Sequence, residues 1–123
     1  MSYLLDTCIL IDLLRGQQVA EAGIASLSVR PSVCAVSVME LTAGARSQRA
    51  ETQIDQLLNV YRWVGVDSAI FKTAGSYLRN YRAGHGLDIA DALIAATAEH
   101  HGLKLVTLNV KHFPMFPKLK PAY

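Results

Sequence analysis

Two aspartates, Asp88 and Asp91, stand three residues apart at the head of an apolar stretch, residues 87–98. At 3.6 residues per turn they project from the same face of a helix, with about 5–6 Å between their Cβ atoms. The other positions are apolar nearly all round, so we expect a buried helix whose alanines pack closely against a sheet. A carboxylate in apolar surroundings is costly unless a cation or several donors meet it, so the pair indicates a charge-binding site. The structural alternative is that Asp88 caps the helix and Asp91 lies in its first turn.

Two further acids, Asp6 and Glu40, follow short apolar runs that are typical of buried parallel strands. Ligands bind outside the carboxyl ends of such strands, so both acids are expected at the functional edge of a sheet. Each acid has an alternative explanation. Asp6 suits the N-cap of the helix that follows, and Ser37 as N-cap with Glu40 has the S-x-x-E spacing of a capping box.

Four carboxylates at one edge would repel one another, and the adjoining motif positions contain no Lys or Arg. A hard divalent cation, Mg²⁺ or Mn²⁺, would compensate their charge, whereas no Cys or His spacing indicates zinc. Thr7, Thr107 and Asn109 add polar groups at strand ends, where they could support ligands or hold a phosphate oxygen, or simply form turns. A carboxylate-held cation suits the metal-assisted hydrolysis of a phosphodiester.

The glycine-rich loops that cradle nucleotide phosphates do not occur in the sequence, which disfavours a nucleotide cofactor. The chain has 12 Lys and Arg against 10 Asp and Glu, a net charge of only +2, so binding to a nucleic acid would have to be local. Cys8 and Cys34 have no metal spacing and indicate reduced thiols of a cytosolic protein. With no basic leader and no apolar run of about 20 residues, we expect a cytoplasmic protein without a membrane contact.

Apolar runs and amphipathic segments alternate along all 123 residues, which predicts one doubly wound α/β domain, residues 1–123, with a mainly parallel sheet. Strands are expected at 3–5, 33–36, 63–66 and 103–107. Helices are expected at 8–15, 19–27, 38–46, 50–61, 68–81 and 88–101. These elements would bring the four acids to one edge.

Four segments in this order resemble the PIN-domain ribonucleases, specifically the VapC-type toxins: LLDT at 4–7, SVMEL at 37–41, DIADALIAATA at 88–98 and LVTLNVKHF at 105–113. The resemblance implies a three-layer α/β/α domain with about four to five strands. It further implies a Mg²⁺- or Mn²⁺-dependent endoribonuclease, usually a homodimer, that a cognate VapB-type antitoxin holds inactive.

The positions that match the family's acidic core are Asp6, Glu40 and Asp91, which the resemblance makes metal ligands, and Asp88 matches an accessory acid. Many members carry a further acid where this chain has Asn109, which leaves open whether one or two metal ions bind. The alternative function is a PIN-like scaffold that binds RNA or a protein without catalysis.

Overall fold

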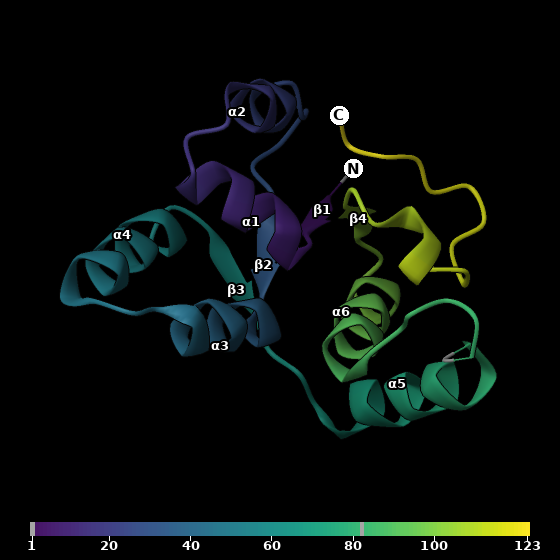
Figure 1. The fold of residues 1–123 in the computed structure, drawn as a ribbon. Coiled ribbons are helices and arrows are strands. Elements are labelled where there is room, and N and C mark those ends of the chain that lie inside the picture. Colours follow the sequence, from purple (N-terminus) through teal and green to yellow (C-terminus); the bar gives the residue numbers. More distant parts are fainter. Residues whose placement is uncertain (1, 82) are drawn as a thin grey trace.

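The computed structural model describes residues 2–81 and 83–123, in which four short parallel strands form one sheet (Figure 1). The strands are β1 (Tyr3–Leu5), β2 (Ser32–Cys34), β3 (Arg62–Val64) and β4 (Lys104–Val106). Their order across the sheet is β3-β2-β1-β4, and each neighbouring pair is parallel. Parallel neighbours need crossover connections, and the helices provide them. The prediction of an α/β domain with a parallel sheet of about four to five strands is therefore confirmed with four.

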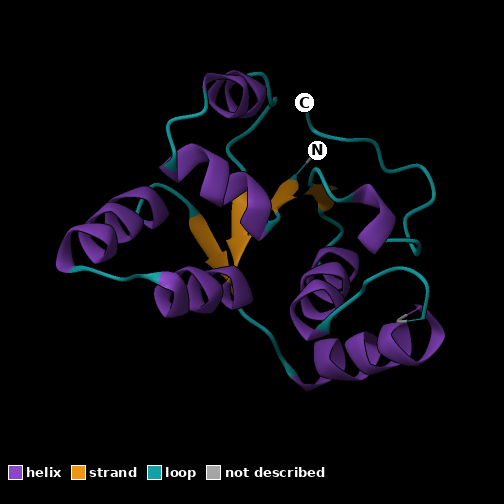
Figure 2. Ribbon diagram, in the orientation of Figure 1, coloured by secondary structure: helices purple, strands orange, loops and turns teal. Residues whose placement is uncertain are grey.

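Helices cover both faces of this sheet (Figure 2). They are α1 (Thr7–Leu14), α2 (Gln18–Ala25), α3 (Ala35–Gly44), α4 (Gln48–Leu58), α5 (Ser68–Tyr81) and α6 (Ile89–His100), followed by a 3₁₀ turn, η1 (Val110–His112). Alternate strand residues divide the core, because successive side chains point to opposite faces. Leu5 packs with residues of α1 and α4, while Leu4 packs with α6, and α5 lies against the outer side of α6. The result is a three-layer α/β/α fold.

Several predicted turn signals are confirmed. Asp67 caps α5 by accepting a hydrogen bond from the backbone N–H of Ile70 at 2.9 Å. Gly16 and Gly102 follow α1 and α6 with φ of 70° and 61°, the left-handed conformation that glycine adopts at little cost. Within residues 2–81 and 83–123, no helix is long and apolar enough to cross a membrane.

Two predictions at helix starts are wrong. The helix expected from Val38 begins at Ala35, so β2 ends at Cys34 and Ser37 lies inside the helix rather than at its N-cap. Ile89 was expected in a surface buried nearly all round, yet it is 68 % exposed. Burial of α6 begins only at Ala92, because its first turn lies at the open edge of the sheet beyond the strand ends.

Candidate active site

Asp6 follows β1 directly and is buried, with only 3 % of its surface exposed. Its Oδ1 accepts a hydrogen bond from the backbone N–H of Thr7 at 2.8 Å, so it caps α1. Its Oδ2 accepts a 2.6 Å hydrogen bond from the hydroxyl of Thr107 and a longer one, 3.5 Å, from the Cys8 thiol. The N-cap explanation and the placement at the sheet edge are therefore both confirmed, and the side chain is held by donors on two elements.

Thr107 stands at the carboxyl end of β4, where it is completely buried. Its hydroxyl donates to Asp6 and accepts a hydrogen bond from the backbone N–H of Asn109 at 3.0 Å. A hydroxyl that donates to a carboxylate and accepts from an amide has its orientation fixed. Thr107 thus positions Asp6. Asn109 contributes its backbone here, and its side chain is exposed to solvent.

Glu40 lies on α3, the helix that follows β2. In the sheet, β2 and β4 lie on opposite sides of β1. Oε1 of Glu40 accepts a 2.6 Å hydrogen bond from the hydroxyl of Thr7, which also lies 2.8 Å from the hydroxyl of the buried Ser37. The capping box proposed for Ser37 and Glu40 is absent, because both residues lie within α3. Thr7 therefore contacts two acids, Asp6 through its backbone N–H and Glu40 through its side chain.

Asp88 and Asp91 form a reciprocal capping box at the start of α6. Asp88 Oδ1 accepts a hydrogen bond from the N–H of Asp91 at 2.8 Å, and Asp91 Oδ2 accepts one from the N–H of Asp88 at 3.4 Å. The structural explanation for this pair is thus confirmed. Nδ1 of His112, from η1, lies 3.4 Å from Asp91 Oδ2. The sequence carries no signal that places His112 beside Asp91.

The electrostatic surroundings of Asp91 differ from those of an ordinary surface acid. Partial burial and the carboxylates of Asp88 and Asp6 raise its pKa to about 6, opposed by the N–H of Asp88 and by His112. The contribution of Asp6 is informative, because this acid lies between β1 and α1 whereas Asp91 lies on α6. The two carboxylates act on each other across the edge of the sheet.

The donor set at this edge consists of carboxylate and hydroxyl oxygens, which suit a hard divalent cation. Such a cation would also relieve the repulsion that raises the pKa of Asp91. Among residues 2–81 and 83–123, no three His, Cys, Asp or Glu side chains already converge on one point, since the acids bind hydroxyls and amides. The donor types of these residues therefore fit a hard cation.

Cys8 is the thiol nearest to the acids. It is a free, half-buried cysteine, and burial together with the charge of Asp6 raises its pKa above the usual value. A thiol with a raised pKa stays protonated at neutral pH and is a poor nucleophile. Cys8, which packs against the core beside the site, is therefore a packing residue and not a nucleophile.

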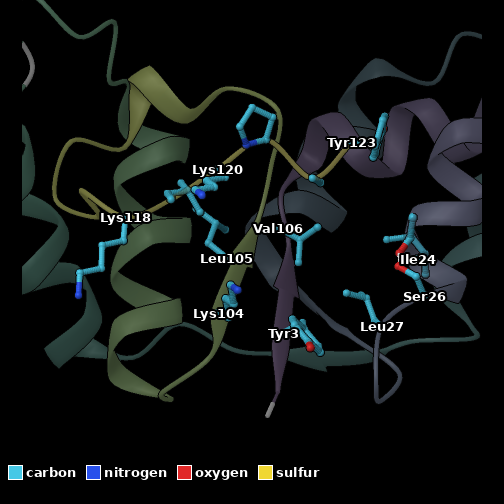
Figure 3. A pocket seen from close by; sticks show the side chains of 14 residues that line it. Tyr3, Ile24, Ser26, Leu27, Lys104, Leu105, Val106, Lys118, Lys120 and Tyr123 are labelled. Atoms are coloured by element: carbon cyan, nitrogen blue, oxygen red, sulfur yellow. Dashed lines mark hydrogen bonds between the residues drawn. The ribbon is translucent and has the colours of Figure 1, made fainter.

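One cavity among the described residues adjoins the acids, and another lies away from them. A cavity of about 440 Å³ between α1, α3 and α4 is lined in part by Thr7 and Glu40. The other, of about 480 Å³, lies under the C-terminal segment beside Tyr3, Lys104 and Lys120 (Figure 3). None of the candidate site residues lines this second cavity.

Comparisons with known proteins agree with this architecture. The family profile of the PIN domain matches residues 3–116. Ribonuclease VapC19 of Mycobacterium tuberculosis is 39 % identical over 124 residues, which cover 98 % of each chain. Ribonuclease VapC10 of the same species is 37 % identical over 123 residues, covering 98 % of this chain and 92 % of the relative. Among solved structures, a toxin–antitoxin complex from Klebsiella pneumoniae is similar, with a TM-score of 0.84, 28 % identity and 98 % coverage of both chains.

Proposed function

We propose that this chain, which belongs to the PIN-domain family and within it to the VapC ribonucleases, is the toxin of a toxin–antitoxin pair and cuts RNA endonucleolytically. The observation that carries the proposal is the linkage of acids from three elements at one sheet edge. Thr7 joins Asp6 to Glu40 by hydrogen bonds of 2.8 and 2.6 Å, and Asp6 raises the pKa of Asp91. We propose that the protein acts in the cytoplasm, on RNA present there.

We propose further that Asp6, Glu40 and Asp91 hold a divalent cation, Mg²⁺ or Mn²⁺. When bound, such a cation polarises a phosphodiester, lowers the pKa of a water and stabilises the leaving oxygen. The chain's own residues prepare the ligands. Thr107 fixes the buried carboxylate of Asp6, and Thr7 fixes that of Glu40. Asp88 holds the first turn of α6 and thereby orients Asp91.

The partner we propose is a VapB-type antitoxin. The similar structure from Klebsiella pneumoniae is a toxin–antitoxin complex. Two apolar side chains at the rim of the site fit a protein partner. Met39 and Ile89, next in sequence to Glu40 and Asp88, are 67 % and 68 % exposed. A homodimer, usual in the family, completes the proposal, and light scattering of the purified chain would test it.

The test is RNA cleavage by the chain purified free of any partner, with cellular RNA as substrate. We expect discrete cuts with Mg²⁺ or Mn²⁺ and none with EDTA. Asp91→Asn should abolish cutting, whereas Asp67→Asn, which changes an aspartate that caps α5 outside the site, should leave it intact. RNA binding without any metal-dependent cutting would favour the scaffold function instead.

A further inference from the structure

The cavity of about 440 Å³ between α1, α3 and α4 opens directly beside the acids, and we refer to it as the α1–α3–α4 cavity. Thr7 and Glu40, joined by a 2.6 Å hydrogen bond, line the cavity and also belong to the candidate site. Its volume lies within the range of about 300–1,000 Å³ that is typical of sites for small molecules. A group seated in this cavity would therefore lie next to the reacting phosphodiester.

The lining of the cavity combines apolar walls with planar polar side chains. Ile11, Leu41 and Ile54 contribute apolar surface from the three helices. Arg15, just after α1, and Gln53, on α4, also line it and are exposed. A guanidinium plane stacks on a nucleobase, and a carboxamide offers both donors and an acceptor to a base edge.

We infer that the α1–α3–α4 cavity receives an unstacked nucleobase of the RNA next to the bond that is cut, with Arg15 and Gln53 as specificity residues. This inference rests on the proposed function. A nucleotide joins a flat, weakly polar ring to an anionic phosphate, and the cavity offers apolar walls together with the positive charge of Arg15. Proteins that read single-stranded RNA by sequence bind splayed bases in this manner.

Gly44 provides a direct way to block the cavity. It lines the cavity, and a Cβ added to it would meet no heavy atom within 4 Å. Gly44→Leu should therefore fill the space without moving the backbone, and it replaces a helical glycine by a better helix former. Gly44→Ala, which adds only a methyl group, is the matched control. For Gln53→Ala the control is Gln56→Ala, an exposed glutamine on the same helix that does not line the cavity.

The experiment sequences the cut sites in a pool of RNA with randomised sequence, in the presence of Mn²⁺. The wild type should prefer particular bases at one position beside the cut. Gly44→Leu and Gln53→Ala should weaken this preference about tenfold, the size expected when hydrogen bonds to a base are lost. Gly44→Ala and Gln56→Ala should keep it. Urea unfolding curves establish that each variant is folded.

Two results would overturn the inference. The wild type could show no base preference beside the cut, or folded Gly44→Leu could cut with an unchanged preference. If Gly44→Leu kept the preference and also escaped inhibition by the antitoxin, the cavity would be assigned to a peptide. Failure of the proposed function differs from both results, because the wild type would then cut no RNA at all.

Discussion

The hydrogen bond from Thr107 to Asp6 offers a quantitative test of how the site is held. Thr107→Val keeps the shape of a fully buried side chain but removes the hydroxyl that donates to Asp6 at 2.6 Å and accepts from the N–H of Asn109 at 3.0 Å. A hydrogen bond to a charged group contributes about 1.5–3 kcal/mol and one to an amide about 0.5–1.5 kcal/mol. We therefore expect the free energy of unfolding to fall by about 2–4 kcal/mol, measured by urea denaturation without metal.

Thr97→Val is the matched control for this change. Thr97 is also completely buried, but its hydroxyl donates to the backbone carbonyl of Leu93 at 2.7 Å, far from the acids along α6. Its loss should cost about 1 kcal/mol and leave RNA cleavage unchanged. Thr107→Val should in addition slow cleavage, because Asp6 loses the donor that fixes its Oδ2. Equal stability of the two variants, with full activity in both, would refute this account of Asp6.

Three further predictions follow from single contacts. The pKa of Asp91 is raised to about 6 in the folded protein, whereas an aspartate in the unfolded chain has a pKa of about 3.9. The folded state therefore binds the proton of the Asp91 carboxyl group more tightly than the unfolded state does. The metal-free protein should therefore lose stability as the pH rises from about 4 to about 6, and Asp91→Asn should remove that loss in urea unfolding curves. At limiting Mn²⁺, cleavage should fall as the pH drops through about 6, because a proton competes with the cation for Asp91. A pH–rate profile at limiting Mn²⁺ that is unchanged down to pH 4.5 would contradict this. Tyr123→Phe removes the hydroxyl that donates to Asp12 at 2.5 Å. It should lower the free energy of unfolding by about 1–2 kcal/mol in urea, with little effect on cleavage. An unchanged urea midpoint would refute this prediction.

The strand and helix pattern was predictable because each element carries a local signal. Apolar runs mark the strands, and residues such as Asp67 and Gly102 mark helix ends through capping and left-handed turns. The placement of Asp6 and Thr107 also followed from local pattern, since both stand at the carboxyl ends of strands. In a parallel sheet these ends share one edge.

The contacts that connect the acids were not predictable, because they depend on how separate elements pack. Thr7 and Glu40 are 33 residues apart, and their hydrogen bond depends on how α3 packs beside α1. Ser37 has the spacing of a capping residue, but packing of α3 against β2 buries it inside the helix. The position of His112 beside Asp91 likewise depends on the path of the chain after β4. Long-range contacts of this kind override local preferences.

The most direct test of the account is the binding of Mn²⁺ to the purified, metal-free chain, measured by titration calorimetry. The central claim is that the carboxylates of Asp6, after β1, Glu40, on α3, and Asp91, on α6, act together as one metal centre. We predict that Glu40→Gln and Asp91→Asn each weaken Mn²⁺ binding by at least about tenfold, whereas Asp67→Asn binds like the wild type. Wild-type affinity in both Glu40→Gln and Asp91→Asn would contradict the claim.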